Sequence, residues 1–292
     1  MPRIPPWIRL RMNAESEFAH VHNLMGDLGL HTVCKSAKCP NIHECWGRGT
    51  ATMMLLGNLC TRACRFCAVP AGRPRGLDLD EPRRVAEAAR RMNLRHVVLT
   101  SVARDDLPDG GAGIFAETIL AIRRELPGAT IEVLTPDFQG NFDSLNLVLD
   151  AKPDVFNHNL ETVKRLQAAI RPQASYGRSL SVLRAAARRP EPPVVKSGLM
   201  VGLGETDEEI TEAMRDLYEA GVRLLTVGQY LQPTRAHRPV ARYVEPERFA
   251  AYEREARAMG FLGVASGPMV RSSYKAEELL KAAREAASLA AP

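Results

Sequence analysis

The 292-residue sequence has no cysteine after Cys67, few aromatic residues and no long apolar run. Without a stretch of about 18 apolar residues, it predicts no membrane-spanning helix. Aromatic residues make up 5% of the chain and no lysine/arginine tract stands out, so we expect no nucleic-acid partner. No apolar stretch of roughly 7–15 residues follows the start Met, which predicts no secretory signal and a reducing, cytoplasmic location.

The six cysteines therefore lie in one short region and form two triplets. The first triplet, with the spacing C-x4-C-x5-C, is Cys34, Cys39 and Cys45. The second triplet, with the spacing C-x3-C-x2-C, is Cys60, Cys64 and Cys67. Three thiolates leave one iron of a [4Fe–4S] cluster without a cysteine ligand. Two triplets predict two such clusters and favour catalysis over storage or structure.

Two other uses of the cysteines stay open at this point. Six thiols can form disulfides, but disulfide scaffolds are usually short secreted chains. A zinc site usually takes two separated C-x2-C pairs, whereas this chain has one pair, Cys64 and Cys67. A zinc site with three cysteines would recruit His43 or His31 as the fourth ligand.

Short apolar runs alternate with helical patterns after the cysteine region. The runs predict strands at 51–57, 95–102, 130–137, 155–160, 194–203 and 224–232. The periodic segments predict helices at 81–93, 113–126, 142–150, 179–189, 207–221 and 246–260. Six β-then-α units predict an α/β fold, a partial parallel (β/α)6 TIM-type barrel. In such barrels the chemistry lies at the carboxyl ends of the strands, where this sequence is polar or rich in glycine.

We expect three segments along the chain. Residues 1–50 form an N-terminal extension that carries the first triplet and begins with a short basic, Pro-rich arm at 1–10. Residues 51–268 form the partial barrel. Residues 269–292 form a C-terminal segment with the sequence RSSY followed by a helix.

The second triplet, directly after the first barrel strand, resembles the radical S-adenosylmethionine superfamily. Phe66 fits the aromatic residue usual before the third cysteine, and GLMVGLGE at 198–205 is similar to the superfamily's glycine-rich fifth strand. Within it, the chain resembles the lipoyl synthase family from about His31 to Ala276. The first triplet and the blocks TSVARDDLPDGG, EVLTPDFQG, FNHNLETV, GQYLQPT and GPMVRSSYKA carry this resemblance. Ala68 and Met269 are small departures from the family pattern.

The resemblance implies a sulfur-inserting enzyme. Two [4Fe–4S] clusters and S-adenosylmethionine are the expected cofactors. The cluster on the second triplet reduces S-adenosylmethionine to a radical that removes hydrogen from C6 and C8 of a protein-bound octanoyl-lysine. The cluster on the first triplet is the sulfur source. The resemblance makes Ser273 the fourth protein ligand of this cluster. The simpler explanation from the sequence alone is that Ser272 or Ser273 is the N-cap of the helix that follows. We expect Ser273 to matter more than Ser272.

The resemblance also implies partners. These are octanoylated lipoyl-carrier domains of 2-oxoacid dehydrogenase E2 subunits and of the glycine cleavage H protein, a ferredoxin- or flavodoxin-type reductant, and an iron–sulfur carrier protein. The formal net charge of +5 favours an acidic partner.

Six polar residues at strand ends are candidate contacts for S-adenosylmethionine: Ser101, Asp105, Asn157, Asn159, Glu161 and Lys196. Ordinary loop capping or surface ion pairing is the competing explanation for each. Two rival functions also stay open, a different radical sulfur- or methylthio-transferring enzyme and an iron–sulfur electron carrier. An electron carrier would not cleave S-adenosylmethionine.

Overall fold

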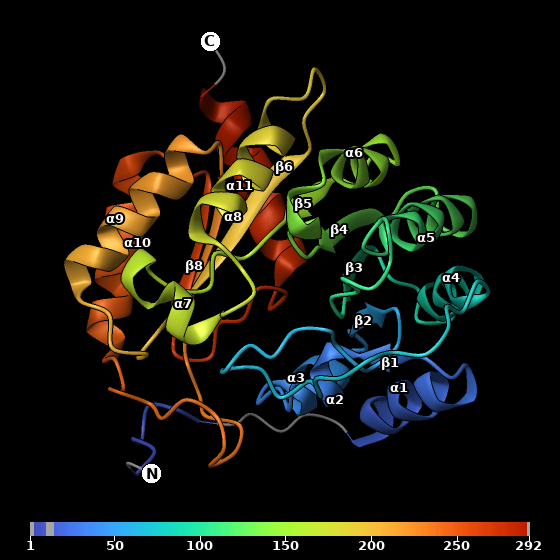
Figure 1. Ribbon diagram of the computed structural model, residues 1–292, viewed down its shortest axis with the longest axis horizontal. Coiled ribbons are helices and arrows are strands. Elements are labelled where there is room, and N and C mark those ends of the chain that lie inside the picture. The colour runs from blue at the N-terminus through green and yellow to red at the C-terminus, as the bar shows by residue number, and fades with distance from the viewer. Residues whose placement is uncertain (1–2, 10–14, 291–292) are drawn as a thin grey trace. The chain divides into compact units, whose positions relative to one another are not determined.

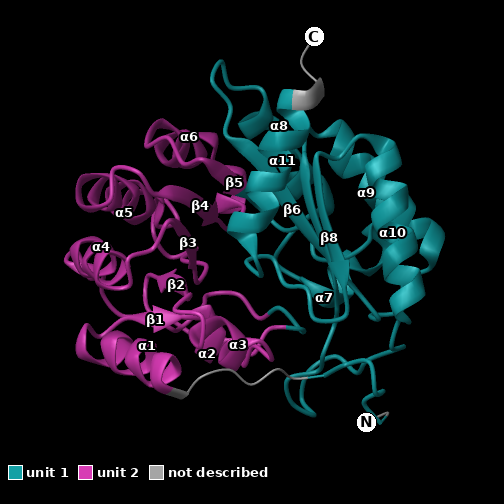
Figure 2. Ribbon diagram, turned by 180° about the vertical axis from the view of Figure 1, so that it is seen from behind, with its two compact units in different colours: residues 1–9, 64–66, 157–292 teal, residues 10–63, 67–156 magenta. Residues whose placement is uncertain are grey.

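The computed structural model describes residues 3–9 and 15–290 (Figure 1). The chain divides into two compact units, coloured separately in Figure 2. Unit 1 comprises residues 1–9, 64–66 and 157–292, and unit 2 comprises residues 10–63 and 67–156. Of the predicted arm at 1–10, residues 1, 2 and 10 lie outside the described residues, and 3–9 contain no helix or strand.

Unit 2 is a layer of strands covered by helices. Its elements are α1 (Glu15–Asp27), β1 (His31–Thr32), α2 (Val33–Ser36), α3 (Ile42–Trp46), β2 (Thr52–Leu55), α4 (Glu81–Arg91), β3 (His96–Ser101), α5 (Ala112–Glu125), β4 (Thr130–Leu134), η1 (Phe138–Gly140) and α6 (Phe142–Asp150). Strands β2, β3 and β4 are parallel neighbours, with Thr52 opposite Val98. Short β1 pairs antiparallel with β2. Helices α4, α5 and α6 lie side by side against these strands (Figure 1).

Strand β5 (Val155–Asn157) lies where the chain passes from unit 2 to unit 1. Unit 1 then contains η2 (Lys164–Leu166), α7 (Gln167–Ile170), α8 (Tyr176–Ala187), β6 (Val194–Val201), α9 (Asp207–Glu219), β7 (Leu224–Gln229), α10 (Pro246–Met259), β8 (Gly263–Gly267) and α11 (Ala276–Ala290). Strands β6, β7 and β8 are parallel neighbours.

All six predicted strands and all six predicted helices are present. Strand β8 was not predicted from the sequence, because the run GVASG has small residues of low strand propensity. Its glycine is nevertheless required, since a Cβ on Gly263 would lie 2.7 Å from Leu224 Cδ2. Helix α9 begins with Thr206 as its N-cap, in a capping box with Glu209. No helix of the described residues combines the length and apolar character needed to cross a membrane.

Candidate active site

The first triplet lies in unit 2 on two short helices before β2. Thr32 caps α2 by accepting a hydrogen bond from Lys35 N at 3.3 Å. The chain then turns so that Cys39 N donates to Cys34 O at 2.9 Å and Cys45 lies in α3. Phe18 of α1 stacks on His43 at a centroid distance of 4.8 Å and packs against Trp46. The aromatic contacts fix α3 against α1 and so hold the peptide that carries the triplet.

The three thiols of the first triplet lie close enough to influence one another's ionisation. Burial raises the pKa of Cys45 to about 12, and charges on Cys34 and Cys39 add to this increase. Burial also raises the pKa of Cys34, with a further contribution from Cys39. Three thiolates at this place therefore repel one another and need positive charge beside them. Iron of a cluster supplies that charge, so the donor set fits a [4Fe–4S] cluster.

Cys60 of the second triplet follows β2, and its sulfur is held by backbone donors. Cys60 Sγ accepts hydrogen bonds from Arg62 N at 3.4 Å and from Ala103 N at 3.3 Å. Hydrogen bonds to the sulfur ligands of a cluster tune its reduction potential. The Cys60 backbone N–H donates to Pro70 O and its carbonyl accepts from Gly72 N, which closes the motif as a compact loop. The sulfur of Cys60 is thus positioned by backbone groups of its own unit.

Cys67 also belongs to unit 2, whereas Cys64 belongs to unit 1. The backbone beside Cys64 is held there by Arg65, whose N–H donates to Ile170 O and whose carbonyl accepts from Arg238 N, both at 2.9 Å. None of the six cysteines, all within the described residues, forms a disulfide. In the same described ranges, no group of three or more His, Cys, Asp or Glu side chains is arranged around a single metal ion.

A buried arginine ties the cluster loop to the ends of β3 and β4. Arg62 donates from Nε and Nη2 to both carboxylate oxygens of Asp105, at 2.7 and 2.8 Å. The same Nη2 donates to Asp137 Oδ1 at 2.6 Å, and the Asp137 side chain is fully buried. Burial alone would lower the pKa of Arg62, but the two carboxylates outweigh it and raise the pKa above its ordinary value. The hydroxyl of Thr61 strengthens the same connection, because it donates to Ala103 O and accepts from Asp105 N, both at 3.0 Å.

The two candidate S-adenosylmethionine contacts of unit 2 differ in their surroundings. Asp105 is engaged by Arg62 through both carboxylate oxygens. Ser101 ends β3, and its buried hydroxyl has no hydrogen-bond partner among the described residues. A buried hydroxyl normally finds a partner, so Ser101 is the better candidate for a ligand contact.

The candidates of unit 1 follow β5 and lie beside β6. Asn159 Nδ2 donates to Glu161 Oε1 at 3.0 Å, and Ser272 Oγ donates to Asn159 Oδ1 at 2.7 Å. Glycine at 198 makes this approach feasible, because a Cβ there would lie 2.9 Å from Asn159 Oδ1 and 3.0 Å from Ser272 Oγ. Burial raises the pKa of Glu161, opposed by the charge of Arg171 and the hydrogen bond from Asn159.

Asn157 and Lys196 are fully buried on β5 and β6. The buried Arg171 donates from Nη1 to the carbonyls of Asn159 and Leu160. These hydrogen bonds fix the backbone that follows β5. The chain after β5 runs along β6, where His158 N donates to Lys196 O at 3.2 Å and Glu161 N donates to Gly198 O at 2.9 Å.

Ser273, the expected ligand, lies half-buried between β8 and α11. The peptide before it crosses β7 closely, since a Cβ on Gly228 would lie 2.2 Å from Val270 O. Helix α11 begins at Ala276, so neither serine occupies the position directly before the helix. The hydroxyl of Ser272 instead bonds Asn159, which gives that serine a tertiary contact.

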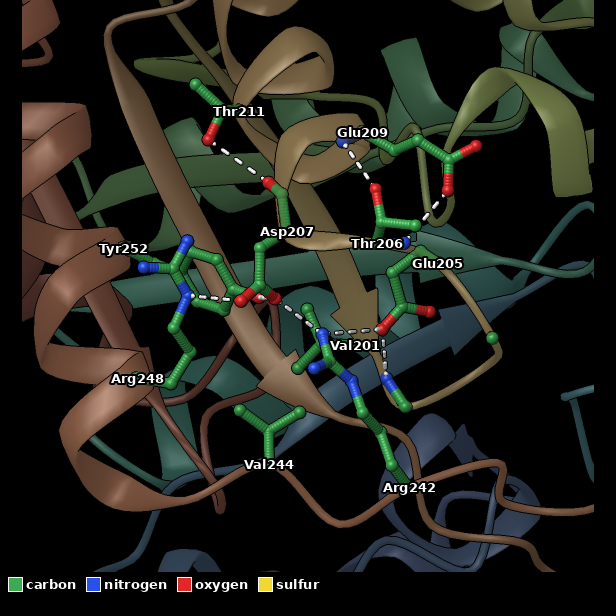
Figure 3. A network of polar contacts seen from close by, with 12 residues as sticks. Val201, Glu205, Thr206, Asp207, Glu209, Thr211, Arg242, Val244, Arg248 and Tyr252 are labelled. Carbon is green, nitrogen blue, oxygen red and sulfur yellow. Dashed lines mark hydrogen bonds and ion pairs between the residues drawn. The ribbon is translucent and has the colours of Figure 1, made fainter.

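The glycine-rich strand end is stabilised by its own glutamate. Glu205 accepts from Gly202 N at 2.6 Å and from Leu203 N at 2.9 Å. Figure 3 shows Asp207 beside it, where Tyr252 Oη and Arg242 Nη2 each donate to Oδ1 at 2.6 Å. Arg248 Nε lies 3.0 Å from the other oxygen. These contacts hold the loop before α10 against the start of α9, a structural task rather than a ligand site.

The roles of Arg62, Asp137, Arg171 and Ser272 were not predicted from the sequence. Arg62 lies inside the cysteine motif, so its position was a usable signal. Asp137 and Ser272 are far from their partners in sequence, and Arg171 is 11 and 12 positions from its own, with no local pattern that marks it.

Comparisons with known proteins show which family the chain belongs to. The family model described as "Radical SAM superfamily" matches residues 54–217. A protein named lipoyl synthase from Rubrobacter xylanophilus is 57% identical over 283 residues, 97% of this chain and 88% of that protein. The lipoyl synthase of Bacillus subtilis is 52% identical over 277 residues, 94% of this chain and 93% of that protein.

Solved structures share the fold at low sequence identity. Methylornithine synthase (PylB) aligns with a TM-score of 0.54 and 14% identity over 86% of this chain and 71% of its own. HydG, a maturase of the [FeFe]-hydrogenase, aligns with a TM-score of 0.58 and 17% identity over 79% of this chain and 54% of its own. The predicted α/β class, a partial parallel barrel, is confirmed.

Proposed function

The chain belongs to the lipoyl synthase family of radical S-adenosylmethionine enzymes, and from this premise we propose which of its residues carry the reaction. The reaction is the insertion of two sulfur atoms at C6 and C8 of a protein-bound octanoyl chain. Unactivated C–H bonds are beyond acid–base side chains, so [4Fe–4S] clusters and S-adenosylmethionine supply the radical and the sulfur. The protein's share is to bind, orient and shield these groups.

Cys60, Cys64 and Cys67 hold the cluster that binds S-adenosylmethionine. The observation that carries this assignment is the position of Cys60 in the loop after β2, with its sulfur accepting hydrogen bonds from two backbone N–H groups. Arg62 and Asp105 orient this loop rather than contact the nucleoside. Ser101 of unit 2 and Asn157, Asn159, Glu161 and Lys196 of unit 1 are the proposed contacts for S-adenosylmethionine. Support comes from the full burial of Asn157 and Lys196 and from the buried hydroxyl of Ser101, which has no hydrogen-bond partner among the described residues.

The first triplet and Ser273 hold the sulfur-donating cluster. The mutual charge repulsion of Cys34, Cys39 and Cys45 supports the first part of this assignment. The tertiary contact of Ser272, next in the chain, supports an ordered backbone at Ser273. We therefore propose three segments. The N-terminal extension at 1–50 carries three ligands of the sulfur-donating cluster, the partial barrel covers 51–268, and the C-terminal segment at 269–292 carries Ser273.

The enzyme acts on lipoyl-carrier domains. We propose the E2 subunits of 2-oxoacid dehydrogenases and the glycine cleavage H protein as the carriers. A ferredoxin- or flavodoxin-type protein supplies electrons, and an iron–sulfur carrier protein rebuilds the consumed cluster. A cytoplasmic location suits this chemistry, because its thiolates must stay reduced.

Anaerobic incubation with dithionite, S-adenosylmethionine and an octanoyl-lysyl peptide, followed by mass spectrometry, tests the function. We expect 5′-deoxyadenosine and a peptide that has gained two sulfur atoms. Cleavage without sulfur insertion in the fully reconstituted protein would indicate a different radical enzyme. If S-adenosylmethionine is not cleaved at all, the result favours an iron–sulfur electron carrier instead.

A further inference from the structure

The segment 71–80, AGRPRGLDLD, directly follows the second triplet and is exposed along almost its whole length. It contains no helix and no strand beyond one bridge residue. Leu77 is 42% exposed and Leu79 is 78% exposed. Single exposed leucines are ordinary, but two of them beside a reaction centre form an apolar surface that a partner can cover.

The segment is exposed and also anchored. At its start, Gly72 N donates to Cys60 O at 2.8 Å, and Leu59 packs against Gly72. In its middle, Gly76 O accepts from Arg104 Nη2 at 3.1 Å. Near its end, Asp78 forms an ion pair with Arg84 of α4. A surface whose backbone is already fixed loses little conformational entropy when a partner binds.

The charges of the segment are unequally compensated. Its acidic residues are neutralised, because Asp78 pairs with Arg84 and Asp80 pairs with Arg83. Its two arginines, Arg73 and Arg75, have no hydrogen bond or ion pair with any residue in the described ranges. Two free guanidinium groups therefore stand next to two exposed leucines. Guanidinium groups without intramolecular carboxylates are well suited to bidentate contacts with carboxylates of another protein.

We propose that segment 71–80 is the docking surface for the carrier domain, with Arg73 and Arg75 binding acidic side chains beside the octanoyl-lysine and Leu77 and Leu79 covering an apolar patch. The proposal rests on the function proposed above, because it names where the macromolecular substrate of that site binds. The surface continues from the loop of Cys60 and Cys67, so a carrier bound there presents its lysine next to the cluster motif. Charge complementarity at such a rim chiefly speeds association.

The test compares two substrates and two kinds of variant. The docking variants are the charge reversal Arg73→Glu/Arg75→Glu and the apolar change Leu77→Ser/Leu79→Ser. The matched controls on the same unit are Arg124→Glu and Leu147→Ser. Arg124 is an exposed arginine of α5 without a hydrogen bond or ion pair among the described residues, and Leu147 is a leucine of α6 that is 44% exposed. Each protein is reconstituted and assayed on an octanoylated carrier domain and on a short octanoyl-lysyl peptide.

We expect each docking variant to lose about tenfold in kcat/KM on the carrier domain, mainly through KM, while turnover of the peptide stays within about twofold of wild type. The controls should retain turnover of both substrates. Stopped-flow binding of the carrier domain, which needs no turnover, should show an association rate that falls with salt in wild type and responds much less in the charge-reversal variant.

The outcomes separate the two proposals. If wild type does not process the peptide at all, the proposed function fails. If wild type processes both substrates and the docking variants process the carrier as wild type does, the docking surface is refuted while the function stands. An association rate equally salt-dependent in wild type and the charge-reversal variant also refutes it.

Discussion

Removing the guanidinium of Arg62 should destabilise the fold strongly, because the buried carboxylate of Asp137 then loses its positively charged partner. In the native protein the Asp137 carboxylate is fully buried and accepts from Arg62 Nη2 at 2.6 Å and from Gln139 N at 3.1 Å. Arg62→Ala leaves this charge buried without its cation. Breaking a buried ion pair from one side costs about 3–5 kcal/mol. The Asp105 side chain is 27% exposed and can turn to water, so we assign most of the loss to Asp137.

That loss is a large share of the roughly 5–15 kcal/mol that stabilises a typical domain. At about 2–4 °C per kcal/mol for a chain of about this size, Tm should fall by roughly 6–20 °C. Calorimetry under anaerobic conditions, at matched iron content, measures it. The control is Arg83→Ala, which breaks an exposed pair with Asp80 and should change Tm little.

A second variant isolates the buried charge. In Arg62→Ala/Asp137→Asn the buried group is neutral, so at least half of the lost stability should return. An Arg62→Ala protein as stable as wild type, or a double variant no more stable than the single one, would refute the assignment of the cost to the unpaired carboxylate.

Three further expectations concern the clusters, the serines and one buried carboxylate. Alanine at the second triplet should end cleavage of S-adenosylmethionine, whereas alanine at the first triplet should spare cleavage and end sulfur insertion; equal loss of cleavage with the other cluster intact would contradict this division. Ser273→Ala should retain cleavage and lose lipoyl product, as measured by mass spectrometry. Ser272→Ala should weaken binding of S-adenosylmethionine by about tenfold, since it removes the hydrogen bond that orients the part-buried Asn159 and such a loss costs roughly 1–3 kcal/mol. Identical behaviour of the Ser272 and Ser273 variants would contradict the separate roles assigned to the two serines. Burial raises the pKa of Glu81, which accepts from Leu56 N at 2.7 Å, so its charge costs stability as pH rises from the ordinary value of 4.5 through the raised one. Glu81→Gln should therefore gain stability relative to wild type across that interval, and a pH-independent difference would contradict it.

The sequence alone determined which cofactors the chain can bind and the order of its strands. The spacing of six cysteines within a short region is a local property, and so is the alternation of apolar runs with helical periodicity. Both were therefore readable without the fold. Strand β8 escaped because its burial depends on glycines that fit against β7 and α11 rather than on large apolar side chains.

Only the tertiary structure decided what the individual polar residues do. Arg62 and Asp137 are 75 positions apart, and Ser272 and Asn159 are 113 positions apart. Asp105, expected as a contact for S-adenosylmethionine, is held by Arg62. Ser272, expected to matter less than its neighbour, is bonded to Asn159. Such pairs form where parallel strands bring loops from distant parts of the chain to one edge of a sheet. A charge or hydroxyl in the sequence carries no record of which loop will face it, so its partner is fixed only when the strands have paired.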